Sequence, residues 1–307
     1  MALITGRELL QKAKEERYAV GAFNINNMEI LQAITEAAQD ERSPAIIAVS
    51  EGAIKYAGLA YLISMVRVAA GDVDVPLALH LDHGRDLEVI GSCIEGGFTS
   101  VMIDGSHLDF EKNIFLTQKV VEMAHARGIS VEGELGRLKG IEEGIDVRQG
   151  EAFLTDPAAA REFVERTQLD SLAVAIGTSH GAYKFKGEVK LDFQRLRAIA
   201  KEVDIPLVLH GASGVPPAVL EKGEKYGARF PGAKGVPDDS IREAVKVGMS
   251  KINIDTDLRL SFIGAIREAL VLQPQEFDPR KILGPARKAV EEIVRHKMKL
   301  FGSSGKA

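Results

Sequence analysis

The chain has 307 residues, of which 45% are hydrophobic and 27% are charged, and its formal net charge is −5. This composition is typical of a globular protein large enough for one α/β barrel or two smaller domains. The chain contains no basic block or tail, so a nucleic-acid partner is not expected. It also lacks a signal-peptide pattern and an apolar run of membrane-spanning length, so we expect a cytoplasmic protein without a membrane partner.

The single cysteine, Cys93, cannot form an internal disulfide. It falls within a stretch from Asp86 to Gly96 that has a helical pattern. We therefore interpret Cys93 as a small core residue and not as a nucleophile.

Short apolar runs alternate with longer amphipathic runs along the whole chain. In chain order, strands are predicted at 19–23, 44–49, 77–81, 99–103, 129–134, 172–176, 207–210 and 251–255. Helices are predicted at 5–17, 28–40, 61–71, 87–95, 110–127, 157–167, 193–202, 238–247, 258–270 and 285–301. A glycine-bearing stretch at 136–150 and a Gly/Pro/Lys-rich stretch at 221–237 are predicted to be loops.

Strict alternation of apolar strands and helices predicts a parallel sheet covered by helices. Eight such units at this length favour the α/β class and a single (β/α)8 TIM barrel that spans residues 1–307 and ends in closing helices. A dinucleotide-binding fold would need a Gly-x-Gly fingerprint after the first strand. Residues 22–27 read AFNINN, so that fold is disfavoured.

Three histidines stand before a glycine at or just past the end of a predicted strand. They are His83, His180 and His210. The active site of a (β/α)8 barrel lies at the carboxyl ends of its strands, so the three imidazoles are expected to converge. Three imidazoles with an open position form a catalytic site for Zn²⁺ or a similar ion. The alternative is three separate, hydrogen-bonded histidines at loop starts.

Carboxylates near these histidines are candidates for proton transfer. Asp82 precedes His83 directly and is either a general acid/base or the partner that orients an imidazole. Glu132 and Glu134 alternate on the predicted fifth strand, so both face one side and must be paired or bind a cation. Glu134 is the nearer to the strand end and is a candidate metal ligand. Glu142 lies in the following loop, which resembles a lid that carries a base; the alternative is a solvated acidic loop.

The loops after the predicted seventh and eighth strands are candidates for a phosphate site. They begin at Gly211–Gly214 and at Asn253–Thr256, and they offer backbone N–H groups and the hydroxyls of Ser213 and Thr256. A divalent metal, a phosphate site and two proton-transfer carboxylates together indicate aldol chemistry or isomerisation of a sugar phosphate.

Six motifs, spread over essentially the whole chain, resemble those of the class II, metal-dependent fructose-1,6-bisphosphate aldolases. They are LHLDHG at 79–84, VEGELGRLKGIEE at 131–143, AIGTSHGAYK at 175–184, LHGASG at 209–214, KINIDT at 251–256 and FDPR at 277–280. The resemblance implies reversible cleavage of fructose 1,6-bisphosphate in glycolysis and gluconeogenesis. A tagatose-1,6-bisphosphate aldolase shares these motifs and stays an alternative, and a catalytically silent sugar-phosphate-binding barrel is a more remote one.

The resemblance also implies roles for individual residues. His83, His180 and His210 would hold the catalytic zinc, or Co²⁺ in its place, with Glu134 as a further ligand. Asp82 would handle the proton of the C4 hydroxyl, and Glu142 would take a proton from the dihydroxyacetone phosphate carbon. Asp104 matches a second, non-catalytic metal site.

The remaining implied features concern the substrate and the assembly. The substrate-binding matches are Asn24, Ser50, Gly181, Gly211, Ser213, Asn253, Asp255 and Thr256. Arg280 matches an arginine that grips the far phosphate, often from a neighbouring subunit. A monovalent cation, Na⁺ or K⁺, is expected near the phosphate loop, and a homodimer or homotetramer is expected in solution. The predicted sixth strand carries no lysine at its tip, which disfavours the covalent Schiff-base route.

Overall fold

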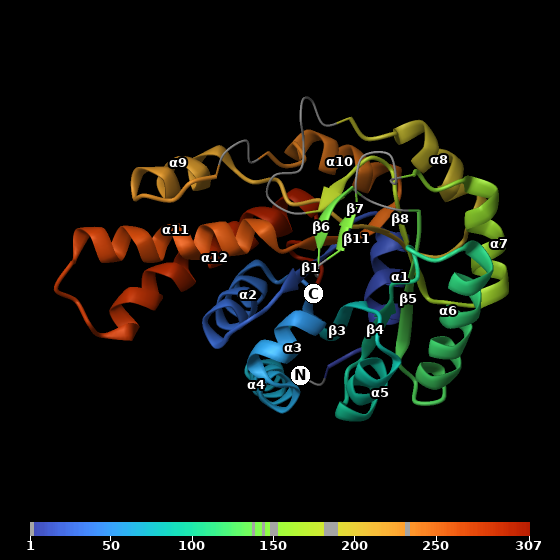
Figure 1. The fold of residues 1–307 in the computed structure, drawn as a ribbon, viewed down its shortest axis with the longest axis horizontal. Helices are drawn as coiled ribbons and strands as arrows, with labels where there is room; N and C mark the ends of the chain where they lie inside the picture. Colours follow the sequence, from blue (N-terminus) through green and yellow to red (C-terminus); the bar gives the residue numbers. More distant parts are fainter. Residues whose placement is uncertain (1–2, 137–138, 143–144, 148–152, 181–189, 231–233) are drawn as a thin grey trace.

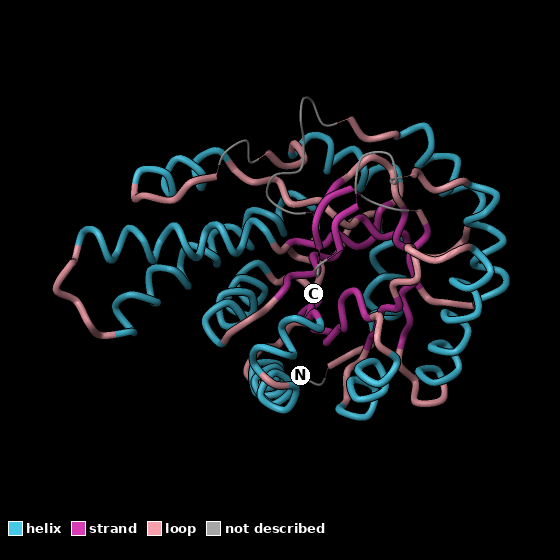
Figure 2. Tube along the Cα trace, viewed as in Figure 1, coloured by secondary structure: helices cyan, strands magenta, loops and turns pink. Residues whose placement is uncertain are grey.

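The computed structural model describes residues 3–136, 139–142, 145–147, 153–180, 190–230 and 234–307. Eight parallel strands close into a barrel in the order β1-β11-β10-β8-β5-β4-β3-β2, with helices around them (Figure 1, Figure 2). The predicted TIM barrel is therefore confirmed. The barrel strands are β1 (Val20–Asn24), β2 (Ala45–Ser50), β3 (Leu77–Gly84), β4 (Ser100–Ile103), β5 (Ser130–Leu135), β8 (Ser171–Val174), β10 (Leu207–Leu209) and β11 (Met249–Ile254).

The helices follow the strands in the predicted alternation. They are α1 (Gly6–Glu16), α2 (Met28–Glu41), α3 (Glu51–Ala57), α4 (Leu59–Gly71), α5 (Leu87–Gly96), α6 (Phe110–His125), α7 (Pro157–Thr167), α8 (Phe193–Glu202), α9 (Pro217–Lys225), α10 (Asp238–Val247), α11 (Thr256–Leu272) and α12 (Pro279–Phe301). Many begin at a side chain that accepts a backbone N–H, such as the capping box of Thr5 and Glu8 at α1. Cys93 lies buried on α5, as expected, and its burial raises the pKa of the thiol to about 12.

The two ends of the barrel differ in polarity. Helix α1 covers the amino-terminal end, where Leu9, Leu10 and Ala13 pack against Val20 and Ala22 of β1. This apolar packing closes the amino-terminal end of the barrel. The carboxyl ends of the strands carry buried carboxylates and imidazoles, such as those of Asp82, His83 and His210, and this is where the functional site is found.

Four local predictions need correction. The stretch 136–150 is not all loop, because β6 (Lys139–Glu142) and β7 (Ile145–Val147) pair with β9 (Ser179–His180) in a small sheet of order β7-β6-β9. Strand β6 pairs with the adjacent β7 and also with β9, which comes much later in the chain, so the local pattern does not reveal this sheet. Helix α9 occupies the first part of 221–237, and α3 begins directly after Ser50, whose hydroxyl caps it.

The last correction concerns α12, which begins at Pro279 and not at Pro285. Both prolines suit the first turn of a helix, but Asp278 precedes Pro279 and its side chain accepts the Arg280 N–H. Helices α11 and α12 contact each other and extend from the barrel as an arm (Figure 1). Leu270, Val271, Leu272 and Phe277 near the tip of this arm are exposed.

Among the described residues, no single helix is long and apolar enough to cross a membrane. Helices α3 and α4, which are bent by 97° relative to each other, reach that length and composition only as a pair.

Candidate metal centre and active site

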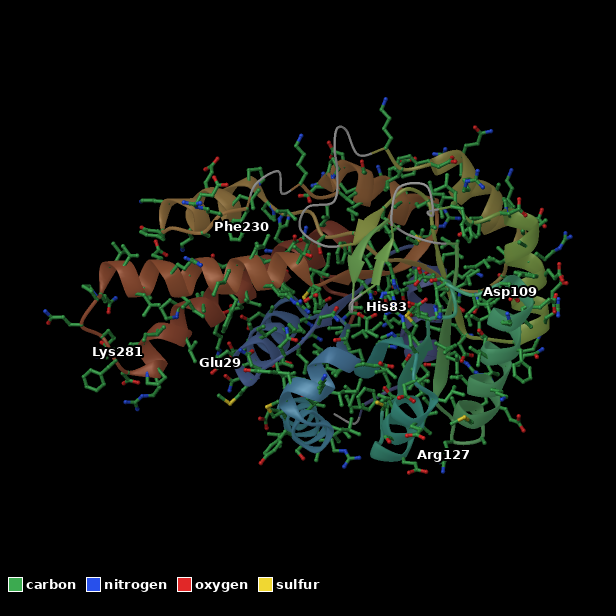
Figure 3. All side chains as sticks on the ribbon, in the orientation of Figure 1. Glu29, His83, Asp109, Arg127, Phe230 and Lys281 are labelled. Atoms are coloured by element: carbon green, nitrogen blue, oxygen red, sulfur yellow. The ribbon has the colours of Figure 1, made fainter. Side chains whose placement is uncertain are left out.

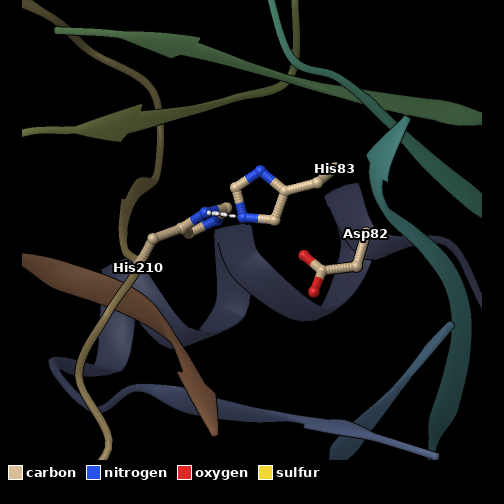
Figure 4. Close-up of side chains that lie close together, drawn as sticks. All are labelled: Asp82, His83 and His210. Atoms are coloured by element: carbon tan, nitrogen blue, oxygen red, sulfur yellow. Dashed lines mark hydrogen bonds between the residues drawn. The ribbon is translucent and has the colours of Figure 1, made fainter. Parts of the chain in front are cut away.

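The centre of the site is the end of β3, where the strand departs from regular geometry. The register of β3 against β4 shifts between Leu81 and Gly84, and His83 adopts a φ of 48°. Neighbouring side chains of a regular strand point to opposite faces, whereas a bulge turns one of them. Asp82 and His83 therefore both lie buried beside His210, which follows β10 (Figure 4).

His83 and His210 face each other through ring nitrogens. His83 Nε2 lies 2.8 Å from His210 Nδ1, and the ring planes meet at 74° (Figure 4). The other nitrogen of each ring lies beside a carboxylate: His210 Nε2 is 2.8 Å from Glu132 Oε1, and His83 Nδ1 is 3.2 Å from Asp104 Oδ2. Each carboxylate is placed to accept an N–H from the outer nitrogen of its ring and so to orient that ring.

The facing nitrogens form a hydrogen bond in which the tautomers of the two rings decide which one donates. Two imidazoles whose ring nitrogens meet beside buried carboxylates are a donor set that fits a metal ion. Glu134 adds a carboxylate, with Oε2 at 3.5 Å from His210 Nδ1 and 3.7 Å from His83 Nδ1. The candidate groups are Asp82 with His83 and His210, and His83 with Asp104 and Glu134.

Asp82 is held by two amides from other strands. Asn24, at the end of β1, donates to Asp82 Oδ2 at 2.8 Å, and Asn253 on β11 donates to Oδ1 at 2.8 Å. Burial by itself would raise the pKa of Asp82, but the neighbouring His83 and His210 outweigh it and lower the pKa well below its ordinary value. The carboxylate is thus ionised, fixed in direction and close to the two imidazoles.

A buried ionic layer lies directly beneath these residues. Lys251 of β11 and Glu132 of β5 are 0% and 1% exposed, with Nζ 2.7 Å from Oε2, and His80 Nε2 lies 3.2 Å from the same ammonium. Burial would raise the pKa of Glu132, but Lys251 and the hydrogen bond from His210 lower it. The sequence required a partner for Glu132 and did not identify it as Lys251. The sequence does contain a signal for this partner. Lys251 is two residues from the predicted site residue Asn253 on one strand, so the two side chains face the same side.

Asp104 belongs to the same cluster. Arg85 donates to its Oδ2 through Nη2 at 2.8 Å and through Nε at 3.2 Å, while Ser106 donates to Oδ1 at 2.7 Å. Burial opposes ionisation, but His83 and Arg85 hold the pKa of Asp104 well below its ordinary value. Asp104 therefore influences the candidate metal centre by orienting the imidazole of His83.

The predicted phosphate-binding residues lie on the adjacent barrel rim. Gly211 follows β10 with a φ of 62°, and Ser213 is buried after it. Asp255 and Thr256 lie at the amino terminus of α11, where Asp255 Oδ1 accepts a hydrogen bond from Arg259 Nε at 2.7 Å. Ser50 ends β2 and accepts the Ala53 N–H at 3.2 Å.

Three predicted residues are only partly described or not described. The backbone of His180 lies in β9 and that of Glu142 in β6; β6 and β9 pair in parallel, with Gly140 opposite His180. The side chains of His180 and Glu142 lie outside the described part of the chain, as does the whole of Gly181. The pairing nevertheless brings the strand of the candidate base beside the strand of the third histidine.

Arg280 lies away from the cluster. Its neighbour Lys281 is found at the far end of the arm from His83 (Figure 3), and the Arg280 side chain is 90% exposed and paired with Asp278. Within one copy of the described chain, Arg280 thus does not join the other candidate residues.

Comparisons with known proteins agree with this geometry. Residues 4–306 match the family model described as fructose-bisphosphate aldolase class-II. The chain is 55% identical over 305 residues to the fructose-bisphosphate aldolase of Thermus caldophilus. The aligned region covers 99% of this chain and 100% of that protein. It is 50% identical over 305 residues to the fructose-bisphosphate aldolase of Helicobacter pylori, with 99% of each covered. The crystal structure of the YdjI aldolase from Escherichia coli K12 matches all of both chains with a TM-score of 0.81 and 36% identity.

Proposed function

The chain belongs to the class II fructose-bisphosphate aldolase family, and we propose that it reversibly cleaves fructose 1,6-bisphosphate into dihydroxyacetone phosphate and glyceraldehyde 3-phosphate with zinc as its cofactor. The observation that supports this most directly is the pair of facing ring nitrogens on His83 and His210 beside the carboxylate of Asp82. A metal site and a proton carrier in contact are what metal-dependent aldol cleavage needs. A lyase of this kind belongs with cytoplasmic sugar phosphates, and we include that location in the proposal.

We assign the metal to His83, His180 and His210, with Glu134 as an additional carboxylate ligand. Bound zinc, or cobalt in its place, would polarise the substrate carbonyl and stabilise the negative charge that develops on its oxygen. Glu132 and Asp104 would hold His210 and His83 in the orientation that presents Nδ1 and Nε2 to the ion. The second group, with Asp104, is the proposed position of a non-catalytic ion.

Asp82 is the proposed base for the C4 hydroxyl in the cleavage direction. Its lowered pKa keeps it ionised and able to accept that proton, which it returns to the aldehyde oxygen during condensation. The amides of Asn24 and Asn253 hold both of its oxygens, and their own Oδ1 atoms are buried without a hydrogen-bond partner in the described residues. These two acceptors are suited to hydroxyl donors of the substrate.

Glu142 is the proposed carrier of the second proton, the one exchanged at the carbon of dihydroxyacetone phosphate. The pairing of β6 with β9 supports this role, since it brings the backbone of Glu142 near that of the proposed ligand His180. The phosphate of the same fragment is assigned to Gly181, Gly211, Ser213, Asp255 and Thr256, with Na⁺ or K⁺ beside them. Ser50 lies on the same rim as the other proposed substrate-binding residues.

The far phosphate is assigned to Arg280 of a second copy. Lys281, the residue after Arg280, lies on the arm away from His83 (Figure 3). The exposed Leu270, Leu272 and Phe277, at the adjoining ends of α11 and α12, provide an apolar surface for association. We therefore propose a homodimer or homotetramer in which the arm of one copy reaches the active site of another.

The test is a side-by-side assay of fructose 1,6-bisphosphate and tagatose 1,6-bisphosphate cleavage, with and without EDTA, in potassium, sodium and tetramethylammonium buffers. We expect a preference for the fructose substrate, loss of activity with EDTA, recovery with zinc or cobalt, and a requirement for a small monovalent cation. A tagatose preference would keep the residue roles and change the substrate. A zinc-loaded protein inert on both substrates would refute the proposal in favour of a silent barrel.

A further inference from the structure

A second buried charge pair lies behind the loop that follows β10. Lys297 of α12 and Asp257 of α11 are 1% and 0% exposed, and Nζ lies 3.0 Å from Asp257 Oδ2. Burial of two opposite charges is costly and does not by itself stabilise a fold. A pair of this kind therefore calls for a second role, and its contacts indicate one.

Asp257 uses both carboxylate oxygens on the backbone of the loop. Oδ2 accepts the N–H of Gly214 at 3.0 Å, and Oδ1 accepts the N–H of Val215 at 2.6 Å. Val215 has a φ of 44°, a left-handed conformation that a β-branched residue adopts only when its surroundings impose it. The Asp257 carboxylate therefore directly restrains the backbone conformation of Gly214 and Val215 at the end of the loop.

Lys297 acts on this restraint through its charge. Its ammonium makes no hydrogen bond in the described part of the chain, and its next carboxylate oxygen after Asp257 is Asp238 Oδ1 at 3.9 Å. A Cβ added to Gly214 would lie 2.7 Å from Nζ, so the loop backbone runs directly against the lysine. Lys297 holds the Asp257 carboxylate in place, because the ammonium 3.0 Å away compensates its buried charge.

The restraint connects the two halves of the proposed phosphate site. Gly211 and Ser213 precede Gly214 on one loop, while Asp257 follows Asp255 and Thr256 directly on the other. We propose that Lys297 and Asp257 are positioning residues that set the spacing of these two loops for the phosphate of dihydroxyacetone phosphate. The inference rests on the proposed function, and it makes the closing helix α12 part of the substrate-binding apparatus.

The experiment measures condensation kinetics of the zinc-loaded, full-length protein with Lys297→Met. We expect the KM for dihydroxyacetone phosphate to rise by about tenfold to a hundredfold, the loss typical of a binding group displaced by about 1 Å. The KM for glyceraldehyde 3-phosphate and the zinc content should stay at wild-type values, since Asp257 restrains Gly214 and Val215 and does not contact the proposed ligand His210. Lys299→Met is the matched control, because Lys299 lies on the same helix and pairs with Glu41 at the surface.

Two further variants keep the test decisive if Lys297→Met fails to fold. Lys297→Met/Asp257→Asn leaves no buried charge, yet asparagine offers one acceptor oxygen to two N–H groups, so the same rise in KM is expected. Gly214→Ala keeps both charges and places a methyl group against Nζ, with the same expectation. A folded double variant with a wild-type KM for dihydroxyacetone phosphate would overturn the inference, as would equal increases in both KM values. Lack of aldolase activity in the wild-type protein would instead refute the proposed function.

Discussion

Replacement of Lys251 by methionine is predicted to weaken both the fold and the metal site. The ammonium lies 2.7 Å from Glu132 Oε2 in the barrel interior, and no solvent reaches either group. At an effective dielectric constant of about 20, two unit charges at this distance attract by about 6 kcal/mol before desolvation is subtracted. Removal of one member of a buried pair costs about 3–5 kcal/mol, because the remaining charge stays uncompensated.

The metal site is affected through Glu132. This carboxylate accepts the N–H of His210 Nε2, and without Lys251 its pKa rises toward the value favoured by burial. A protonated Glu132 no longer fixes the His210 tautomer. Loss of such an orienting contact lowers metal affinity by about tenfold to a hundredfold.

Urea unfolding and zinc titration of the Lys251→Met variant measure the two effects. The double variant Lys251→Met/Glu132→Gln should recover most of the free energy of unfolding, since no charge is buried, but it should keep weaker zinc binding because an amide is a poorer acceptor than a carboxylate. Lys14→Met is the control, because Lys14 pairs with the fully exposed Asp204, and exposed pairs contribute little to stability. A Lys251→Met variant with unchanged stability and zinc affinity would refute this reasoning.

Two more predictions follow from the site. Glu142→Ala should slow hydrogen exchange at the dihydroxyacetone phosphate carbon by about a hundredfold or more while binding of that ligand changes little; an unchanged exchange rate would reassign the base, with Glu143 next in sequence. For His80, burial and the nearby Lys251 lower the pKa to about 3, whereas the unfolded imidazole protonates near about 6.5. The unfolded state therefore binds the extra proton between these values, and stability should fall by about 1.4 kcal/mol per pH unit as pH decreases below about 6.5. Urea unfolding at several pH values should show a smaller slope for His80→Asn, and equal slopes would contradict the assignment.

Local patterns in the sequence were sufficient for the barrel. Eight apolar strands alternate with amphipathic helices, and each element is recognisable from its own residues, so the order along the chain predicts a closed parallel sheet. The same patterns placed His83, His210 and Asp82 at strand ends, and therefore on one rim of the barrel. The motifs identified the class II aldolase family before any geometry was known.

The small sheet of β6, β7 and β9 shows where local patterns fail. The 139–147 segment was predicted to be loop because its glycines and charges hide the short β6–β7 hairpin, and because β9, the third strand of the sheet, comes from a different strand–helix unit. The early start of α12 is a similar case. The helix was predicted to begin at Pro285, but Asp278 caps it at Pro279, which suits the first turn of a helix equally well.

The sequence by itself determined the fold class, the family and the chemical types of residue at the site, because each depends on the identity and spacing of residues in short segments. Only the tertiary structure decided how those residues are paired. The bulge at His83, the clamp of Asn24 and Asn253 on Asp82, and the ion pairs Lys251–Glu132 and Lys297–Asp257 join segments separated by tens to hundreds of residues. Such pairs are selected by burial, since a charge enclosed by the barrel is tolerated only where another element supplies its partner.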